Sequence, residues 1–166
     1  MSLVPNLSFA NPSTPIFGPA PAYASFSSTQ TQVVPAGIAS PATFDTADIP
    51  STAFSLPAPS SVRCGVSGVY KILASAQCDK STGGAGDLEM FLQVNLTPVP
   101  NSATRLQINQ NQESVMTVEW LVQLNAGDTV FVQFFSSTTG LQLLAVPATP
   151  TVPAIPSVIV TLVRIA

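Results

Sequence analysis

The sequence predicts an all-β fold, and three observations carry this prediction. Sixteen prolines and many Ser and Thr residues disfavour helices, because Pro breaks a helix and Ser and Thr are mediocre helix formers. From residue 54 onward, apolar and polar residues alternate with a period of two, which is typical of half-buried strands. The alternating runs recur about every 10–15 residues, as in all-β sandwiches. We therefore expect a jelly-roll β-sandwich of about 8–10 antiparallel strands.

The most regular strand patterns lie in the middle of the chain. Apolar residues occupy every second position of residues 70–78, 88–96, 106–108 and 116–124. Polar residues take most of the alternate positions, so each run is expected to bury one face. Weaker candidates are residues 32–34 and 54–62.

The last third of the chain holds three further strand candidates. Residues 130–135 are apolar at every position except Gln133, and residues 141–146 form a shorter candidate. After a loop that contains four prolines, residues 158–165 are apolar on both faces. Such a strand typically lies in the middle of a sheet and is covered on both sides.

Residues 1–44 differ from the rest of the chain, and we interpret them as an uncharged N-terminal arm that precedes a jelly-roll domain of residues 45–166. The arm holds seven of the 16 prolines and no charged side chain. Its apolar residues between prolines indicate an extended segment that docks on another surface, whereas disordered segments usually combine low hydrophobicity with high charge. A linker whose aromatic residues cover the first strand is the alternative. The docking candidates are Phe9, Phe17, Tyr23 and Phe26.

Charge and residue usage exclude several function classes. Only 8% of the residues are charged, the net charge is −3, and the five cations form no stripe, so no nucleic-acid partner is expected. Histidine is absent, which removes the commonest general base and metal ligand; we expect no enzyme, no cofactor and no bound metal. No stretch approaches the roughly 20 apolar residues of a spanning helix, so membrane insertion is not expected.

Two groups of reactive side chains have structural interpretations. Without a signal-peptide pattern, free thiols are expected for Cys64 and Cys78, with a bridge between them as the alternative. Asp79, Asp87 and Glu89 lie around a Gly-rich loop, where carboxylates can bind calcium. Because their spacing matches no EF-hand, we interpret the segment as a solvated hairpin loop.

Three segments together resemble the tumour necrosis factor and complement globular-head superfamily. They are residues 61–72 with a Gly68-Val69-Tyr70 motif, residues 121–132 around a turn at Gly127-Asp128, and the closing run 157–165. The resemblance implies a ten-stranded jelly roll that assembles as a compact homotrimer and acts as a binding or structural module, not an enzyme. Gly68 is expected to permit a tight start of the strand that Tyr70 pins to the core, and Gly127 to supply the positive φ of its turn.

The implied homotrimer needs apolar contacts between subunits. Phe91, Phe131 and Phe135 lie on the faces opposite to the regular core pattern, and exposed large apolar groups commonly mark interfaces. We expect these three residues and Tyr70 to contribute to the subunit contacts. The alternative is that this second face of the sheet packs beneath a loop or the N-terminal arm.

The sequence lacks the collagen-like stalk and the secretion signal of many complement-type heads. Similar trimeric jelly rolls with few charges occur on spore filaments and on virus and phage particles. We therefore expect a structural virion or surface protein, a minor capsid or capping component anchored to other particle proteins by the arm. Its expected place is the virion or particle surface, with a spore or cell surface as the alternative. The alternative function is a receptor- or glycan-binding head of a spike or fibre. The alternative assembly is a pentamer.

Overall fold

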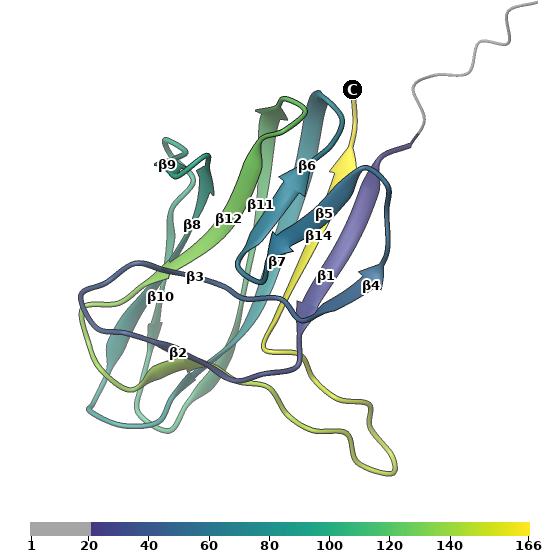
Figure 1. Ribbon diagram of the computed structural model, residues 1–166. Helices are drawn as coiled ribbons and strands as arrows, with labels where there is room; N and C mark the ends of the chain where they lie inside the picture. Colours follow the sequence, from purple (N-terminus) through teal and green to yellow (C-terminus); the bar gives the residue numbers. More distant parts are fainter. Residues whose placement is uncertain (1–20) are drawn as a thin grey trace, which may run out of the picture.

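Two antiparallel β-sheets face each other in the computed structural model, which describes residues 21–166 (Figure 1). Within these residues the chain forms strands, turns and loops but no helix. The predicted all-β sandwich is therefore confirmed. The first described residues and the C-terminus lie at the same end of the sandwich, called the terminal end below (Figure 1).

The first sheet is built around the 13-residue strand β7. One edge of β7 pairs along its length with β11, and its other edge pairs first with β14 and then with β13. The order is β11–β7–β14–β1–β4, and β13 and β2 continue the sheet beside the end of β7. The bounds are β1 (Tyr23–Ser28), β2 (Gln32–Val34), β4 (Thr46–Ile49), β7 (Gly68–Lys80), β11 (Glu113–Leu124), β13 (Leu141–Leu143) and β14 (Val158–Arg164).

The second sheet has the order β10–β8–β12–β6–β5, with short strands β3 on β12 and β9 on β8. The bounds are β3 (Ser40–Pro41), β5 (Phe54–Ala58), β6 (Ser61–Cys64), β8 (Gly86–Val94), β9 (Thr97–Pro98), β10 (Thr104–Ile108) and β12 (Thr129–Phe135). The predicted strand 54–62 is thus two strands that pair with each other, β5 and β6. The predicted strand 141–146 ends at Leu143, because Leu144 already begins a protruding loop.

The core lies between the two sheets and consists of the residues that the alternation predicts. In β7 and β8 the buried positions are every second residue, and in β11 and β12 the inward positions of the same alternation are buried or partly buried. Both sheets contribute, and the least exposed members include Ile72, Ala74, Leu88, Met90, Leu92, Leu124, Val132 and Phe134. This agreement follows from strand geometry, because alternate side chains point to opposite faces of a sheet.

Two glycines shape the terminal end of the sandwich. A side chain at Gly68 would collide with Arg164 and with the carbonyl oxygen of Ala166, so only glycine lets β7 start this close to the C-terminus. Gly127 has a φ of +99° in the turn between β11 and β12, a conformation that favours glycine. The expectations for both glycines are confirmed.

The predicted boundary at residue 44 is wrong, because residues 21–44 belong to the sandwich. They supply β1, β2 and β3, and β1 pairs with both β14 and β4. Ala24 and Phe26 of β1 are buried in the core. The sequence hid this strand because its residues are small and hydroxylated and prolines surround them. The prediction of an arm can apply only to residues 1–20, which lie outside the described residues together with Phe9 and Phe17.

Candidate functional site

The structure separates the residues that were predicted to meet at a subunit interface. Tyr70 is fully buried inside its own subunit, where its hydroxyl donates a 2.5 Å hydrogen bond to the carbonyl oxygen of Val66. Its ring stands edge-on to Phe54 with centroids 5.3 Å apart. Tyr70 is therefore a core residue, and the prediction that it contacts a second subunit is wrong.

The three predicted phenylalanines lie together on the outward face of the second sheet. Phe91 belongs to β8, and Phe131 and Phe135 belong to β12; all three are half-buried. Between them lies Gln133, which is 6% exposed and donates a hydrogen bond to Gln93 at 2.7 Å. Their predicted role as subunit contacts stays a prediction.

The two described docking candidates differ in exposure. Phe26 is 3% exposed and packs in the core, so it is not free to dock elsewhere. Tyr23 begins the same strand but is 47% exposed, on the outward face of the first sheet. The prediction of a docking role is therefore corrected for Phe26 and stays open for Tyr23.

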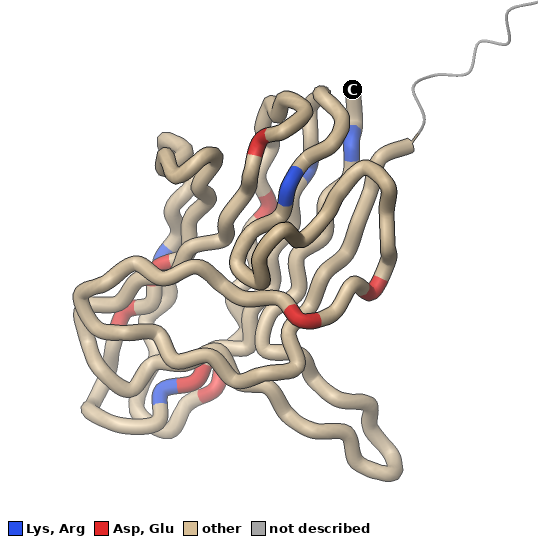
Figure 2. The backbone as a smooth tube through the Cα atoms, viewed as in Figure 1, with Lys and Arg blue, Asp and Glu red and all other residues tan. Residues whose placement is uncertain are grey.

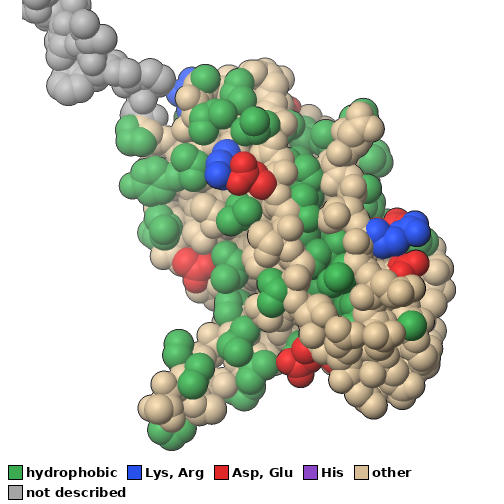
Figure 3. Space-filling view, turned by 180° about the vertical axis from the view of Figure 1, so that it is seen from behind, with side chains coloured by type: hydrophobic (Ala, Val, Ile, Leu, Met, Phe, Trp, Pro, Cys, Tyr) green, Lys and Arg blue, Asp and Glu red, His purple; other side chains and the backbone are tan. Residues whose placement is uncertain are grey.

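Tyr23 belongs to a broad apolar surface that the alternation of the sequence did not predict. We call it the open face: the outward side chains of β1, β14, β7 and β11, together with Ile49 at the end of β4. Its exposed apolar side chains are Tyr23, Ile49, Val115, Leu121, Ile159 and Val163, which are 36–66% exposed. In the space-filling view from behind, hydrophobic side chains spread over this side of the molecule (Figure 3).

The strand register places the residues of the open face in rows across the sheet. Tyr23 pairs with Val163, Val163 with Lys71, and Lys71 with Leu121, so one row crosses four strands. The next row on this face runs through Ser25, Thr161, Leu73 and Glu119. Apolar, hydroxyl and charged side chains thus lie side by side across the four strands.

Six polar side chains of the open face already have partners within the subunit. Ser75 and Thr117 share a hydrogen bond of 3.0 Å, and Ser25 and Thr161 lie 3.5 Å apart, at the limit of one. Lys71 and Glu119 form an ion pair of 2.7 Å, and both are about half exposed. Burying a polar group is costly mainly when it loses its partners. A second protein can therefore cover this face without leaving these groups unpaired.

A second apolar feature lies where the two sheets end side by side. We call it the open flank: β10 and β11 are edge strands of their sheets, and Leu106, Val118 and Val122 between them are only partly buried. On the opposite side of the sandwich lie β4 and β5 (Figure 1). The open face and the open flank share only β11, so they are distinct surfaces.

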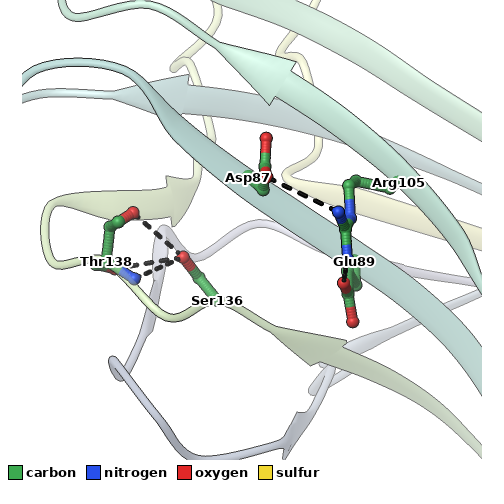
Figure 4. A network of polar contacts seen from close by, with 5 residues as sticks. All are labelled: Asp87, Glu89, Arg105, Ser136 and Thr138. Atoms are coloured by element: carbon green, nitrogen blue, oxygen red, sulfur yellow. Dashed lines mark hydrogen bonds and ion pairs between the residues drawn. The ribbon is translucent and has the colours of Figure 1, made fainter.

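Charged residues are few and are spread over the fold (Figure 2). Arg105 of β10 lies between Asp87 and Glu89 of β8, with nitrogen–oxygen distances of 3.8 Å and 2.5 Å (Figure 4). Hydrogen bonding to Glu89 raises the pKa of Arg105. Asp79 accepts a hydrogen bond from Gln142 at 2.6 Å. The acidic residues around the Gly-rich loop therefore form pairs within the subunit, in agreement with a hairpin loop.

The turn at Gly127 is stabilised by the carboxylate that follows it. Asp128 accepts hydrogen bonds from the backbone N–H of Asn125 and from the side chain of Asn95, both at 2.7 Å. The first of these bonds is the main cause that lowers the pKa of Asp128. Asp128 thus acts in its own turn.

Both cysteines are free thiols buried in the core, so the alternative of a Cys64–Cys78 bridge is not realised. Burial raises the pKa of Cys78 to about 12.

Within residues 21–166 there is no group of three or more His, Cys, Asp or Glu side chains placed to hold a metal ion. In the same part of the chain, no helix has the length and hydropathy to cross a membrane.

Solved structures with the same architecture identify the fold class. The globular domain of zebrafish complement 1qA protein is similar over 87% of this chain and 97% of its own, with a TM-score of 0.53 and 16% identity. Murine APRIL is similar over 87% and 99%, with a TM-score of 0.56 and 8% identity. Eiger TNF from S. frugiperda is similar over 88% and 93%, with a TM-score of 0.57 and 12% identity. No protein-family model and no curated protein matches the sequence.

The chain therefore has the jelly-roll fold of tumour necrosis factor and the complement globular heads. The resemblance drawn from Gly68-Val69-Tyr70, Gly127-Asp128 and the closing strand is confirmed at the level of the fold.

Proposed function

We propose that this protein is a non-enzymatic structural component of a virus or similar particle, and that it assembles as a homotrimer through the open face. In this proposal residues 1–20 anchor each subunit to other particle proteins. The protein then lies on the particle surface as a minor capsid or capping component. A spore or cell surface is the alternative location.

The open face is the observation that carries the self-association. Leu121 is 66% exposed and Val115 is 57% exposed on β11, at the edge of a surface whose charged side chains are the Lys71–Glu119 ion pair, Asp79 and Glu113. Such a surface is typical of protein–protein contacts. Strand β14 adds to this argument because it is apolar on both faces and lies between β7 and β1, yet its own subunit covers only one face.

The open flank is a suitable partner for the open face. Contact between two different surfaces of identical chains is heterologous, and it closes into a ring when the rotation between subunits permits. The flank offers Leu106, Val118 and Val122 in the gap between the sheets, where a neighbouring open face would exclude water. The number of three subunits comes from the resemblance to the superfamily, whose members are similar in forming homotrimers.

The position of the N-terminus supports the proposed anchor. Residue 21 lies at the terminal end of the sandwich, beside the C-terminus (Figure 1). The preceding 20 residues have no charged side chain and include Phe9 and Phe17. Three such segments would leave the trimer at one end and could bind an apolar surface of a particle protein. Mass spectrometry and antibody labelling of intact particles from the producing organism would test the location.

Analytical ultracentrifugation of the full chain tests the assembly. We expect about 52 kDa, three times the 17.2 kDa of the chain. Leu121→Arg should shift the protein to the monomer, because it adds an unpaired charge to the open face. Ile38→Arg is the matched control: Ile38 is 62% exposed but lies in the loop between β2 and β3, so this variant should stay trimeric. A monomeric wild type, or a Leu121→Arg trimer as stable as the wild type, would contradict the proposal.

A receptor- or glycan-binding head is the second candidate function. Half-buried Phe91, Phe131 and Phe135 lie beside the amides of Gln93 and Gln133 on the second sheet. Aromatic rings and amides together are the side chains that commonly fix small ligands, and this face would stay accessible when the open face is buried. Binding of the assembled protein on a glycan array, lost in Phe131→Ala, would support this role.

A further inference from the structure

The connection between β13 and β14 is a hairpin that projects from the end of the sandwich opposite to the terminal end (Figure 1). We call residues 144–157 the projecting hairpin. Every residue from 146 to 155 is exposed, including the apolar side chains of Val146, Val152 and Ile155 at 37%, 52% and 38%. No charged residue occurs between Asp128 and Arg164. Exposed apolar groups on an uncharged projection indicate a contact surface.

The projecting hairpin is ordered by its own contacts. Val146 and Ile155 exchange two backbone hydrogen bonds of 2.9 Å, and the N–H of Thr149 donates to the carbonyl oxygen of Val152 at 2.9 Å. Prolines occupy positions 147, 150, 153 and 156. Each proline restricts φ and so lowers the conformational entropy that ordering would cost. A segment ordered in advance loses less free energy when it binds.

Hydrogen bonds at its base attach the projecting hairpin to the first sheet. Leu144 donates to the carbonyl oxygen of Gln77 at 2.7 Å, and Ser157 donates to the carbonyl oxygen of Ser28 at 2.9 Å. Immediately after Ser157, β14 begins and places Ile159 on the open face. The base of the projecting hairpin therefore lies next to the end of the open face.

The direction of the projecting hairpin points to its partner. It extends below β1 and β4, on the side of the sandwich away from the open flank (Figures 1 and 3). In the proposed ring each subunit has two neighbours, one at its open face and one at its open flank. The projecting hairpin lies on the side away from the open flank, so it can extend toward the neighbour at the open face. A hollow of about 400 Å³ lies between the hairpin and β1 and β4, lined by Ser27, Thr46 and Asp48 on one side and Val146, Ile155 and Pro156 on the other. The hollow is large enough to receive side chains of the neighbour.

We propose that the projecting hairpin clasps a second copy of this chain, so that each subunit grips its neighbour with residues 146–155. This inference rests on the proposed trimer and names a second segment of the subunit contact. The clasp and the open face would act together, because the hairpin is attached to β14, which contributes Ile159 and Val163 to the open face.

Shortening the projecting hairpin tests the clasp. In the full chain, residues 147–154 are replaced by Asn-Gly, which favours the tight turn that would join Val146 directly to Ile155 and keep their hydrogen-bonded pair. We expect a folded protein whose trimer dissociates at concentrations about ten-fold higher or more than the wild type. Val152→Asp should weaken the trimer in the same direction, and Ile38→Asp in the exposed β2–β3 loop is its matched control.

A photo-crosslinking residue at position 152 of the otherwise intact chain gives an independent test that does not depend on how the shortened chain folds. Illumination should join two subunits into a product of about twice the 17.2 kDa chain mass, and the same residue at position 38 should not. A trimeric wild type with no such product, or a folded shortened chain with unchanged trimer dissociation, would overturn the clasp and leave the trimer standing. A monomeric wild type would instead contradict the proposed function and the clasp with it.

Discussion

At the scale of single residues, burial decides what each polar group does. The phenol of Tyr70 and the thiol of Cys64 both donate to the carbonyl oxygen of Val66, at 2.5 Å and 3.0 Å. This shared acceptor ties the loop before β7 to the core. A residue whose aromatic ring suggested an interface is therefore a structural residue at the start of the longest strand.

The first prediction concerns this hydrogen bond. Tyr70→Phe keeps the ring but removes the donor, and Val66 retains Cys64 as a partner, so we expect a loss of about 1 kcal/mol in the free energy of unfolding. Ser137→Ala is the control that removes a hydroxyl from an exposed side chain outside the proposed contacts, so its stability should stay within about 0.5 kcal/mol of the wild type. Urea unfolding at equal protein concentration measures both. A Tyr70→Phe protein as stable as the control would contradict this role.

The second prediction concerns alkaline pH. Burial raises the pKa of Tyr70 from 10.0 to about 12 and that of Cys78 from 9.0 to about 12. The folded state therefore holds both protons more tightly than the unfolded state, and this stabilisation is complete below pH 9 and decreases as the pH rises toward 12.

Urea unfolding from about pH 8 to about pH 11 should show a falling free energy of unfolding. Cys78→Ala removes the group with the lower ordinary pKa, so its decline should be shallower and start at higher pH. A free energy of unfolding that stays constant over this range would contradict the prediction.

At the scale of elements, the strands that the alternation predicted are the long ones. Strands β7, β8 and β11 each have one buried face and one partly exposed face, so their sequences show the period clearly. Strand β1 alternates over only four residues, from Ala24 to Ser27, and both of its faces are buried there, so its pattern is too short to stand out. Short strands such as β3 and β9 contain two residues each, which is too few for any period.

The third prediction concerns where the folded domain begins. A chain that starts at residue 21 keeps β1 between β14 and β4 and should fold with a cooperative unfolding transition. A chain that starts at residue 45 lacks β1, β2 and β3 and loses Phe26 from the core, so it should fail to fold. Circular dichroism and thermal melting distinguish the two. A cooperative melt of the shorter chain would restore the boundary at residue 44.

At the scale of the whole molecule, the low charge of the chain matches the character of the open face, where apolar and hydroxyl side chains outnumber charged ones. Lys71 and Glu119 project from the open face and pair with each other, whereas Asp79 and Glu113 lie at the end of this face away from the terminal end. Association then depends on apolar burial, with the ion pair and the small hydroxyl groups satisfied before a partner arrives.

The fourth prediction follows from this. Raising the NaCl concentration from about 0.1 M to about 1 M screens exposed charges but leaves apolar burial intact, so the trimer should not dissociate. Sedimentation velocity at both concentrations measures this. Charge reversal at either Lys71 or Glu119 should weaken the trimer, and the double variant Lys71→Glu with Glu119→Lys should recover part of the loss. Dissociation of the wild type by salt would contradict an apolar interface.

The sequence by itself determined the all-β class, the long strands, the Gly68 and Gly127 turns and the jelly-roll resemblance. These are local properties: the period of a strand and the backbone freedom of glycine are visible within a few residues. The tertiary structure alone decided that Tyr70 and Phe26 are core residues, that the domain begins by residue 21, and that Val115, Leu121, Ile159 and Val163 form one open face. Those facts depend on which strands become neighbours, and strand pairing brings together residues that are far apart in the chain.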